Sequence, residues 1–585
     1  MIFYLIINMI INVIIIQSVL IAEDKIDEYK ASPEGSSVSI NNNKNYTSSN
    51  FMAVTADPRA TLAAVKILKS GGSAIDAAIS AQMVLNLVEP QSSGIGGGAF
   101  IIYYDYKTKS LSTWDGREKA PISYDESVFI NKNGKRKGFI ESVSGGLAVG
   151  APPLIPLLEK VHNKYGVLKW NSLFDDAIKY SFDGFVVGKR LEKLIQRAPH
   201  LKNSINTKNY FNLDNGGLKE GDLKKNIPFG LTLQKIKNGG SKAFIEGEVA
   251  ANILRTVNNH SENPGKLTIE DFKNINPEIK NPICSTYREW KVCGMGPPSS
   301  GGITVLQILG ILNNFDLKNM DEELLWHLFI ESSKLAYSDR NYYIADTDFI
   351  NVPTKEMLSE SYLNKRSKLI NENTVLNSVR HGQFENYKIS QRGSDSESEK
   401  PSTTHISIID KDGNAISMTS SIEFMFGSGL MASGFLLNNQ MTDFSFYPKD
   451  EKGNLIANRP EPGKKPRSSM SPTMVFDQEG NLKMILGSPG GSRIICYVAA
   501  SLIRMIDLNV DPIDVTNKPN ICNRGGKTTI EIGQIGNSLE EALKLKGHDI
   551  QRKNMTSGLH IIYKDSLGDY YGIADQRREG AAHDL

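Results

Sequence analysis

The stretch PSTTHISIID, residues 401–410, joins a polar loop to an alternating apolar segment. The residues before it, 394–401, are rich in Ser, Asp, Glu and Lys and predict an exposed loop. The alternation predicts a half-buried strand, followed by a hairpin turn at Asp412-Gly413 and a return strand over 414–420. Two threonines therefore stand where an accessible loop enters a strand.

A threonine at such a junction becomes a nucleophile if the peptide bond before it breaks. The new α-amino group has a pKa of about 7.7–8.0 and can act as the base for the neighbouring hydroxyl. That arrangement defines an N-terminal nucleophile hydrolase. A Thr-Thr pair before a strand is common on its own, because threonine favours strands and polar residues favour turns. The interpretation therefore depends on the motifs elsewhere in the chain.

Six further motifs accompany the two threonines in a fixed order. They are NLVEPQSSGIGGGAF (86–100), DGREKAP (115–121), GPPSSGG (296–302), LLNNQMTDF (436–444), PRSSMSP (466–472) and GSPGGSR (487–493). With Thr403-Thr404-His405, this set closely resembles the γ-glutamyltranspeptidase family from about residue 52 to the C-terminus. The resemblance implies an α+β fold, a four-layer αββα sandwich built from both fragments of a self-cleaved chain. Helical patterns early in the chain and strand patterns late in it are compatible with that class.

The glycine-rich part of the first motif, 94–99, fits the letters of a dinucleotide-binding fingerprint. It follows a predicted helix over 74–87 and leads into a predicted strand over 100–104, whereas the fingerprint needs a strand followed by a helix. We therefore reject nucleotide binding and expect these glycines to let the backbone pass close to the active site.

The resemblance assigns the catalytic residues. It implies that Thr403 is the nucleophile and that self-cleavage breaks the bond between Ser402 and Thr403; Thr404 is the rival, but the first threonine of the pair carries the role in the family. Ser421, on the return strand, is expected to support the Thr403 hydroxyl, and its alternative is an exposed strand serine. Gly490-Gly491 are expected to supply N–H groups to an oxyanion, and their alternative is a simple Pro-Gly turn.

The resemblance also assigns the substrate contacts. Arg117 matches the family's arginine for the substrate α-carboxylate, which a guanidinium fork binds with geometry as well as charge. Ser468 and Ser469 match paired serines that bind the same carboxylate. Gln440 and Asp443 match residues that bind the substrate ammonium.

Glu423 departs from the family pattern, which tends to have Asn at this position. With Asp443 nearby, the ammonium pocket would hold two carboxylates. Such a pair either binds a cation more strongly or raises the pKa of its members until one is protonated. We therefore expect Glu423 to change the preference among donor substrates.

The function that the resemblance implies is cleavage of γ-glutamyl amide bonds in glutathione and related donors, with transfer to water, amino acids or peptides. The active form would be a heterodimer of the chain's own fragments, 51–402 and 403–585. One alternative is a related acylase or amidase that acts on glutaryl or poly-γ-glutamyl amides, which Glu423 favours. Another is an inactive surface-binding homologue.

The N-terminus predicts export. Residues 2–22 carry no charge and are long enough to span a bilayer, and a polar stretch follows. We expect 1–22 to be a signal peptide or membrane anchor and 23–50 a disordered linker. The protein would then be periplasmic, extracellular or anchored to the outer face of a membrane.

Charge and cysteine content exclude several classes. With 67 basic and 65 acidic residues the net charge is +2, so nucleic acid is not an expected partner. Four cysteines are too few for a disulfide scaffold. Cys284 and Cys293 flank a strand-like segment and could be bridged only if it folds back, so we expect free, buried thiols. No metal-ligand spacing appears among the nine histidines and four cysteines, and we expect neither metal nor cofactor.

Overall fold

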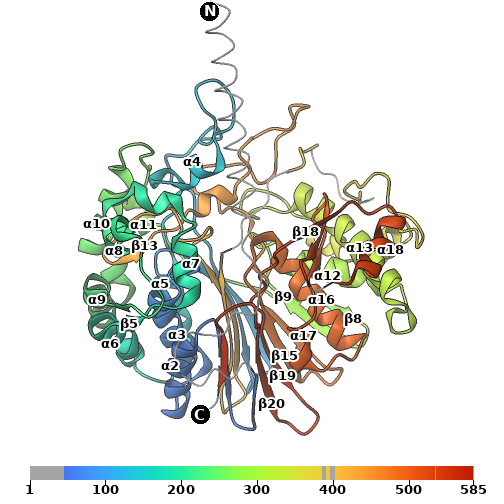
Figure 1. The fold of residues 1–585 in the computed structure, drawn as a ribbon, viewed down its shortest axis with the longest axis horizontal. Helices are drawn as coiled ribbons and strands as arrows, with labels where there is room; N and C mark the ends of the chain where they lie inside the picture. Colours follow the sequence, from blue (N-terminus) through green and yellow to red (C-terminus); the bar gives the residue numbers. More distant parts are fainter. Residues whose placement is uncertain (1–44, 385–390, 396–401, 534, 584–585) are drawn as a thin grey trace, which may run out of the picture.

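Two seven-stranded sheets form the centre of the part of the chain that the computed structural model describes, residues 45–384, 391–395, 402–533 and 535–583 (Figure 1). All neighbouring strands within each sheet run antiparallel. The first sheet has the order β21 (Ala581–His583), β2 (Met52–Thr55), β10 (Thr404–Ile409), β11 (Ala415–Ser421), β3 (Gly98–Asp105), β4 (Ser110–Gly116), β7 (Glu278–Lys280). The second has the order β1 (Asn45–Ser48), β20 (Tyr570–Ala574), β19 (His560–Lys564), β15 (Leu482–Gly487), β14 (Thr473–Phe476), β9 (Trp290–Gly294), β8 (Ile283–Tyr287).

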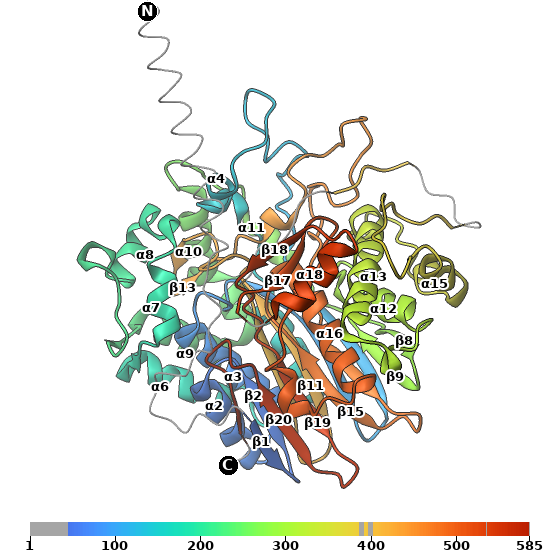
Figure 2. The same cartoon turned by 45° about the vertical axis from the view of Figure 1, so that its right-hand side comes forward.

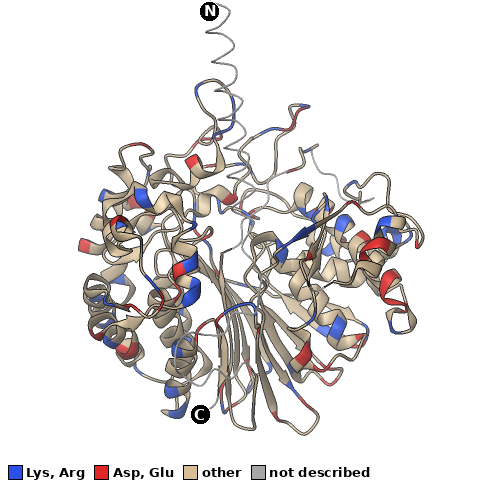
Figure 3. Ribbon diagram, in the orientation of Figure 1, with Lys and Arg blue, Asp and Glu red and all other residues tan. Residues whose placement is uncertain are grey.

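Helices cover the outer face of each sheet, as the two views show (Figures 1 and 2). Over the first sheet lie α2 (Pro58–Lys69), α3 (Ala74–Val88), α5 (Leu154–Tyr165), α6 (Asp175–Asp183), α9 (Ile227–Ile245) and α10 (Gly247–Asn258). Over the second lie α12 (Gly301–Leu312), α13 (Glu322–Tyr343), α16 (Ile494–Ile506) and α18 (Asn537–Leu545). Charged residues lie mainly on the outer helices and loops, and the sheets carry few (Figure 3).

Three apolar clusters fill the spaces between these four layers. One joins α2 and α3 to Ile406 and Ile408 of β10, and a second joins α12, α13 and α16 to the second sheet. The third lies between the two sheets and includes Ile102, Ile409 and Ile485. Alternate residues of β10 therefore face a helix layer and the opposite sheet, which is why the whole strand is buried. The predicted αββα sandwich is confirmed.

Of the two helices next to the site, α3 is the one predicted over 74–87, and both begin at a capping side chain. The carboxylate of Asp57 caps α2, and Ser73 forms a reciprocal capping box with Asp76 at the start of α3. Every residue of α3 is buried, which its many alanines permit. The helix ends at Val88, and the segment 89–97 that follows it lies buried in the centre of the molecule.

Each sheet contains strands from both sides of the Ser402–Thr403 bond. In the first sheet, β10 and β11 lie between β2 and β3, so later strands are inserted between earlier ones. In the second, β14 and β15 continue a sheet whose edge is β8 and β9. In both sheets, strands from the two sides of the bond are therefore direct neighbours.

The described chain begins with a strand that the sequence analysis did not predict. Residues 45–48, assigned to the end of a disordered linker, form β1 and pair with β20. The ring of Tyr46 stacks on that of His583 at 5.1 Å, a contact that local sequence does not reveal. The predicted signal peptide or anchor, 1–22, and the rest of the linker lie outside the described residues. In the part of the chain that is described, no helix is both long and apolar enough to span a bilayer.

The expectation of free thiols is wrong, since all four cysteines are in disulfides, Cys284–Cys293 and Cys496–Cys522. The first pair lies directly opposite in the β8–β9 hairpin, with Cα atoms 4.1 Å apart, because the segment between them folds back at Arg288.

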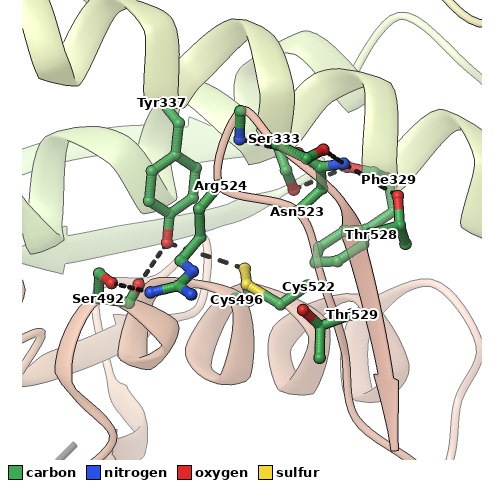
Figure 4. The surroundings of a disulfide bond; sticks show 12 residues. Phe329, Ser333, Tyr337, Ser492, Cys496, Cys522, Asn523, Arg524, Thr528 and Thr529 are labelled. Atoms are coloured by element: carbon green, nitrogen blue, oxygen red, sulfur yellow. Dashed lines mark hydrogen bonds between the residues drawn. A yellow bond between two sulfur atoms is a disulfide. The ribbon is translucent and has the colours of Figure 1, made fainter. Parts of the chain in front are cut away.

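The second disulfide joins α16 to β16 (Ile521–Cys522). Beside it, Tyr337 and Arg524 both point to Ser492 (Figure 4). The Arg524 guanidinium donates to Ser492 Oγ at 2.5 Å. These contacts fix the turn that carries Gly490-Gly491.

Candidate active site

One small cleft gathers most of the residues singled out from the sequence. It is lined by Arg117, Thr403, Ser421, Glu423, Gln440, Asp443, Ser468, Ser469 and Gly491, together with Met470 and Ile494. Of the threonine pair, Thr403 lines the cleft and Thr404 does not.

The hydroxyls of Thr403 and Ser421 meet at the carbonyl group of Ser402. Because Thr404 pairs with Ser420 across β10 and β11, the residues just before and after them, Thr403 and Ser421, are neighbours. Their hydroxyl oxygens are 3.3 Å apart. Ser421 Oγ donates to Ser402 O at 3.0 Å, and the Thr403 hydroxyl contacts the same oxygen. The predicted nucleophile therefore lies against the carbonyl that it would attack.

Contacts on both sides of the Ser402–Thr403 bond hold it in place. Ser402 Oγ donates to the Gln91 carbonyl at 2.5 Å, and a guanidinium nitrogen of Arg578 donates to Thr403 O at 3.2 Å. Ser402 and Thr403 are both buried. The bond is thus fixed by contacts from the start and the end of the chain.

The glycine-rich loop packs closely against the backbone of Ser421. A Cβ on Gly97 would lie 2.1 Å from Ser421 O, and one on Gly96 would lie 2.0 Å from Leu436 O. The amide of Asn438 donates to the carbonyls of Gly96 and Gly150 at 2.8 Å each. The expectation that these glycines allow close passage of the backbone is confirmed.

Arg117 and Asp443 form a buried ion pair inside the cleft. Arg117 Nη2 lies 2.5 Å from Asp443 Oδ2, and Gln440 Nε2 donates to the same oxygen at 2.8 Å. Arg117 also donates to the carbonyls of Pro466 and Arg467. The two residues predicted for opposite charges of a substrate thus neutralise each other in the structure.

The motif at 296–302 holds the serine pair. The amide and the hydroxyl of Ser300 both donate to Ser468 O at 2.7 Å. Arg340, from α13, donates to Ser469 Oγ at 2.8 Å and to Ser300 Oγ at 2.9 Å. This motif therefore positions the serines without lining the cleft itself.

Glu423 has a left-handed backbone, with φ of 77°, and its amide donates to Ser421 Oγ at 2.9 Å. Its carboxylate accepts a hydrogen bond from the Asn439 side chain. It lies in the same cleft as Asp443, so the cleft holds the two carboxylates that the sequence suggested.

Gly490 and Gly491 form the turn before α16. Their φ values of 141° and 57° favour glycine. Gly491 lines the cleft and begins the short 3-10 turn Gly491–Arg493. Gly490 does not line it, and a Cβ there would lie 2.6 Å from the ring of Tyr497.

Three residues of the site carried no assignment from the sequence. Met470 and Ile494 give the cleft an apolar wall. Glu118, next to Arg117, is buried, and neither of its carboxylate oxygens has a hydrogen-bond partner among the described residues. Burial raises the pKa of Glu118 to about 8, although Arg117 opposes the shift. The sequence signal that could have identified Glu118 as a site residue was its position in the motif at 115–121.

The grouped metal-ligating side chains of the described residues lie outside the cleft. Within the described ranges, no group of three metal-ligating side chains lies in it. Its polar groups include two hydroxyls at a carbonyl, a turn with backbone N–H groups, and a buried ion pair.

Known proteins resemble this chain over most of its length. The family model of gamma-glutamyltranspeptidase matches residues 60–585. The chain is 33% identical to the glutathione hydrolase proenzyme of Bacillus subtilis (strain 168), over 91% of each chain. It is also 33% identical to that of Escherichia coli (strain K12), over 90% of each.

Solved structures show the same fold. The cephalosporin acylase from Bacillus halodurans superposes with a TM-score of 0.80 and 25% identity, over 92% of this chain and 96% of that one. The Helicobacter pylori gamma-glutamyltranspeptidase superposes with a TM-score of 0.55 and 31% identity, over 57% of this chain and 97% of that one.

Proposed function

The chain belongs to the gamma-glutamyltranspeptidase family, and from that premise we propose that it is a self-processing threonine enzyme that cleaves γ-glutamyl amide bonds. Its donors would be glutathione and related compounds, and its acceptors water, amino acids or peptides. One observation carries the proposal: the Thr403 hydroxyl lies against the Ser402 carbonyl, beside Ser421, in the cleft that also holds Arg117 and Asp443.

Processing converts one peptide bond into two chain ends. Thr403 Oγ1 attacks the Ser402 carbonyl carbon, and Ser421 Oγ, 3.0 Å from the carbonyl oxygen, donates to the negative charge that develops there. The C–N bond breaks as the nitrogen takes the proton of the hydroxyl, which leaves an ester on Oγ1 and a free α-amino group. Water then hydrolyses the ester, and the fragments end at Ser402 and begin at Thr403.

Turnover repeats the attack on an external amide. The α-amino group of Thr403 accepts the proton from its own hydroxyl, and Oγ1 forms a bond to the γ-carbonyl carbon of the donor. The amine leaves with that proton, and the γ-glutamyl ester on Thr403 passes its acyl group to water or an amine. The turn at Gly490-Gly491, at the N-terminus of α16, is the proposed source of N–H donors to the oxyanion.

Donor binding exchanges the ion pair of the cleft for the two charges of an α-amino acid. The substrate carboxylate takes Arg117 and the serine hydroxyls, and its ammonium takes Asp443 and Glu423. The buried Oε1 of Gln440 has no hydrogen-bond partner among the described residues, so it is an acceptor suited to the same ammonium. Because the substrate carboxylate replaces Asp443 as the partner of Arg117, and the substrate ammonium replaces Arg117 as the partner of Asp443, no buried charge is left unpaired.

A second candidate is an acylase or amidase for glutaryl or poly-γ-glutamyl amides. Two observations favour it. One is the second carboxylate at Glu423, because a pair of neighbouring carboxyls can keep one member protonated and so weaken ammonium binding. The other is the superposition on the Bacillus halodurans cephalosporin acylase. Glutaryl amides lack the α-ammonium, so the relative rates on glutathione and a glutaryl amide distinguish the two candidates. An inactive binding protein is disfavoured, because it has no need for Thr403, Arg117 and the serine pair in one cleft.

We also propose that the protein works outside the cytoplasm, as a heterodimer of its own fragments. Support comes from the uncharged segment 2–22 and from the two disulfides, which persist in oxidising compartments. Whether 1–22 is removed is read from the N-terminal mass of the exported protein.

The decisive experiment is denaturing intact-mass analysis of the wild type beside Thr403→Ala and Thr403→Ser. We expect two wild-type fragments that meet at Ser402–Thr403, one uncut chain for Thr403→Ala, and slower cutting at the same bond for Thr403→Ser. Thr404→Ala is the matched control and should still be cut. An uncut wild type, or a cut Thr403→Ala chain, would contradict the proposal.

A further inference from the structure

A second group of titratable side chains lies outside the cleft, and none of its members lines it. His327 and Glu331 stand one turn apart on the same face of α13, and His548 lies in the turn between α18 and β18 (Ile550–Lys553). All three are buried, and one ligand atom from each lies within 4.8 Å of the others. The helices α13 and α18 lie side by side in both views (Figures 1 and 2).

We propose that His327, Glu331 and His548 bind a zinc-class divalent cation that joins the two segments flanking the Ser402–Thr403 bond. His327 and Glu331 belong to the first segment and His548 to the second. Two imidazoles and one carboxylate form a donor set typical of zinc, with a water as the fourth ligand. The inference concerns binding and holds whether or not the chain is cut.

Hydrogen bonds around the group orient His327 as a ligand. His327 Nε2 lies 2.8 Å from the carbonyl oxygen of Asn371, which can only accept, so this nitrogen carries the hydrogen. Nδ1 therefore has a lone pair that points toward His548 Nε2, 2.8 Å away. A carbonyl that fixes the outer nitrogen of a histidine is the usual support of a metal ligand.

The second histidine can become a ligand by moving one proton within its own ring. In the structure His548 Nε2 donates to His327. Coordination through Nε2 places that hydrogen on Nδ1, which lies 3.9 Å from Glu331 Oε1. No net proton is released, and the ring nitrogens need to separate from 2.8 Å to about 3.3 Å, the spacing on a tetrahedral zinc ion. Burial already disfavours the charged form of both rings.

A cation already occupies the carboxylate of this group. Lys334 Nζ lies 2.8 Å from Glu331 Oε1, while Glu331 Oε2 accepts the backbone N–H of Leu376 at 2.8 Å. The Leu376 contact fixes the carboxylate, and the ammonium competes with a metal for the other oxygen. The Lys334 side chain is partly exposed, so it can turn out to solvent when a metal binds.

The test is a zinc titration of the untagged full chain, stripped with EDTA and freed of chelator, in competition with a chromophoric zinc indicator. Cobalt is titrated in parallel, because a tetrahedral site gives intense visible absorption. We expect one site, a loss of affinity of at least about 10-fold in His548→Gln, and tighter binding in Lys334→Gln. His260→Gln, which removes a histidine outside the group, should bind as the wild type does.

Two results would overturn the proposal: equal zinc affinity in wild type and His548→Gln, or a wild type that binds no zinc below about 10 µM and gives no tetrahedral cobalt spectrum. If His548→Gln fails to fold, the cobalt spectrum of the wild type and the affinity of Lys334→Gln decide. A structural histidine pair predicts no zinc binding in either protein, so that outcome also counts against the site.

Discussion

Glu118, beside Arg117, ionises far from the range of a free carboxyl. Its carboxyl is buried between the backbone and Arg117, whose Nη1 is 3.9 Å from Oε2, and its pKa is raised to about 8. At neutral pH the group is therefore mostly protonated. Between pH 4.5 and 8 the unfolded carboxyl is ionised and the folded one is not, so stability present below pH 4.5 is lost as the pH rises toward 8.

We predict that the ionisation of Glu118 limits donor binding at high pH. Above about pH 8 a negative charge appears beside Arg117 and competes with the substrate carboxylate, so KM should rise by about 10-fold. In Glu118→Gln this rise should be absent, and Tm should fall less between pH 5 and 8. The measurement is KM against pH for both proteins, because titration of the donor itself affects both alike. Parallel KM profiles would refute the role of Glu118.

A second prediction concerns Glu423. Replacing it with Asn removes one of two negative charges facing the substrate ammonium, so kcat/KM for glutathione should fall by about 10-fold relative to a glutaryl amide, which has no ammonium. The matched control is Glu479→Asn, an exposed carboxylate in the turn between β14 and β15. An unchanged ratio of the two kcat/KM values in Glu423→Asn would show that this carboxylate does not discriminate between donor substrates.

At the scale of elements, the glycine-rich loop and β11 act as one unit. We predict that Gly97→Ala displaces Ser421, because the added Cβ would lie 2.1 Å from its carbonyl oxygen. A shift of about 1 Å at a reacting group costs about 100-fold in rate, so both cutting and turnover should slow to that extent. Gly526→Ala, where nothing lies within 4 Å, is the control. Normal processing in Gly97→Ala would mean that β11 tolerates the displacement.

The elements that sequence predicted well are those with local signals. The helix predicted over 74–87 is α3, and the Asp412-Gly413 turn joins β10 to β11 as expected. The β8–β9 hairpin was missed because it turns at Arg288, with φ of 55° and no glycine or asparagine. Its turn depends on tertiary contacts, since the Arg288 side chain binds Asp507 at 2.8 Å.

In the site, too, features with a sequence motif were predicted and features that depend on tertiary contacts were not. Motif order identified which residues meet in the cleft, although up to 350 positions separate Arg117 from its partners. The ion pair of Arg117 with Asp443 and the burial of Glu118 had no local signal, because both depend on the packing of distant segments. The His327 group was missed for the same reason: 221 positions separate His327 from His548.

At the scale of the whole molecule, the shared sheets predict that cutting leaves one particle. Since β10 and β11 pair on both sides with strands from before the cut, the fragments should remain together in native gel filtration and elute with uncut Thr403→Ala. They should separate only in denaturant strong enough to unfold the sheets. Two native peaks from freshly cut protein would contradict this prediction.

Because strands of the two fragments alternate in the sheets, cutting also changes how the protein recovers from unfolding. An uncut chain refolds as a first-order process, whereas two cut fragments would have to meet in solution before either could complete a sheet. Refolding then becomes second-order and slows on dilution. The durability of the cut protein is therefore a half-life set by its unfolding barrier, and a single thermal excursion that the precursor survives would inactivate it for good.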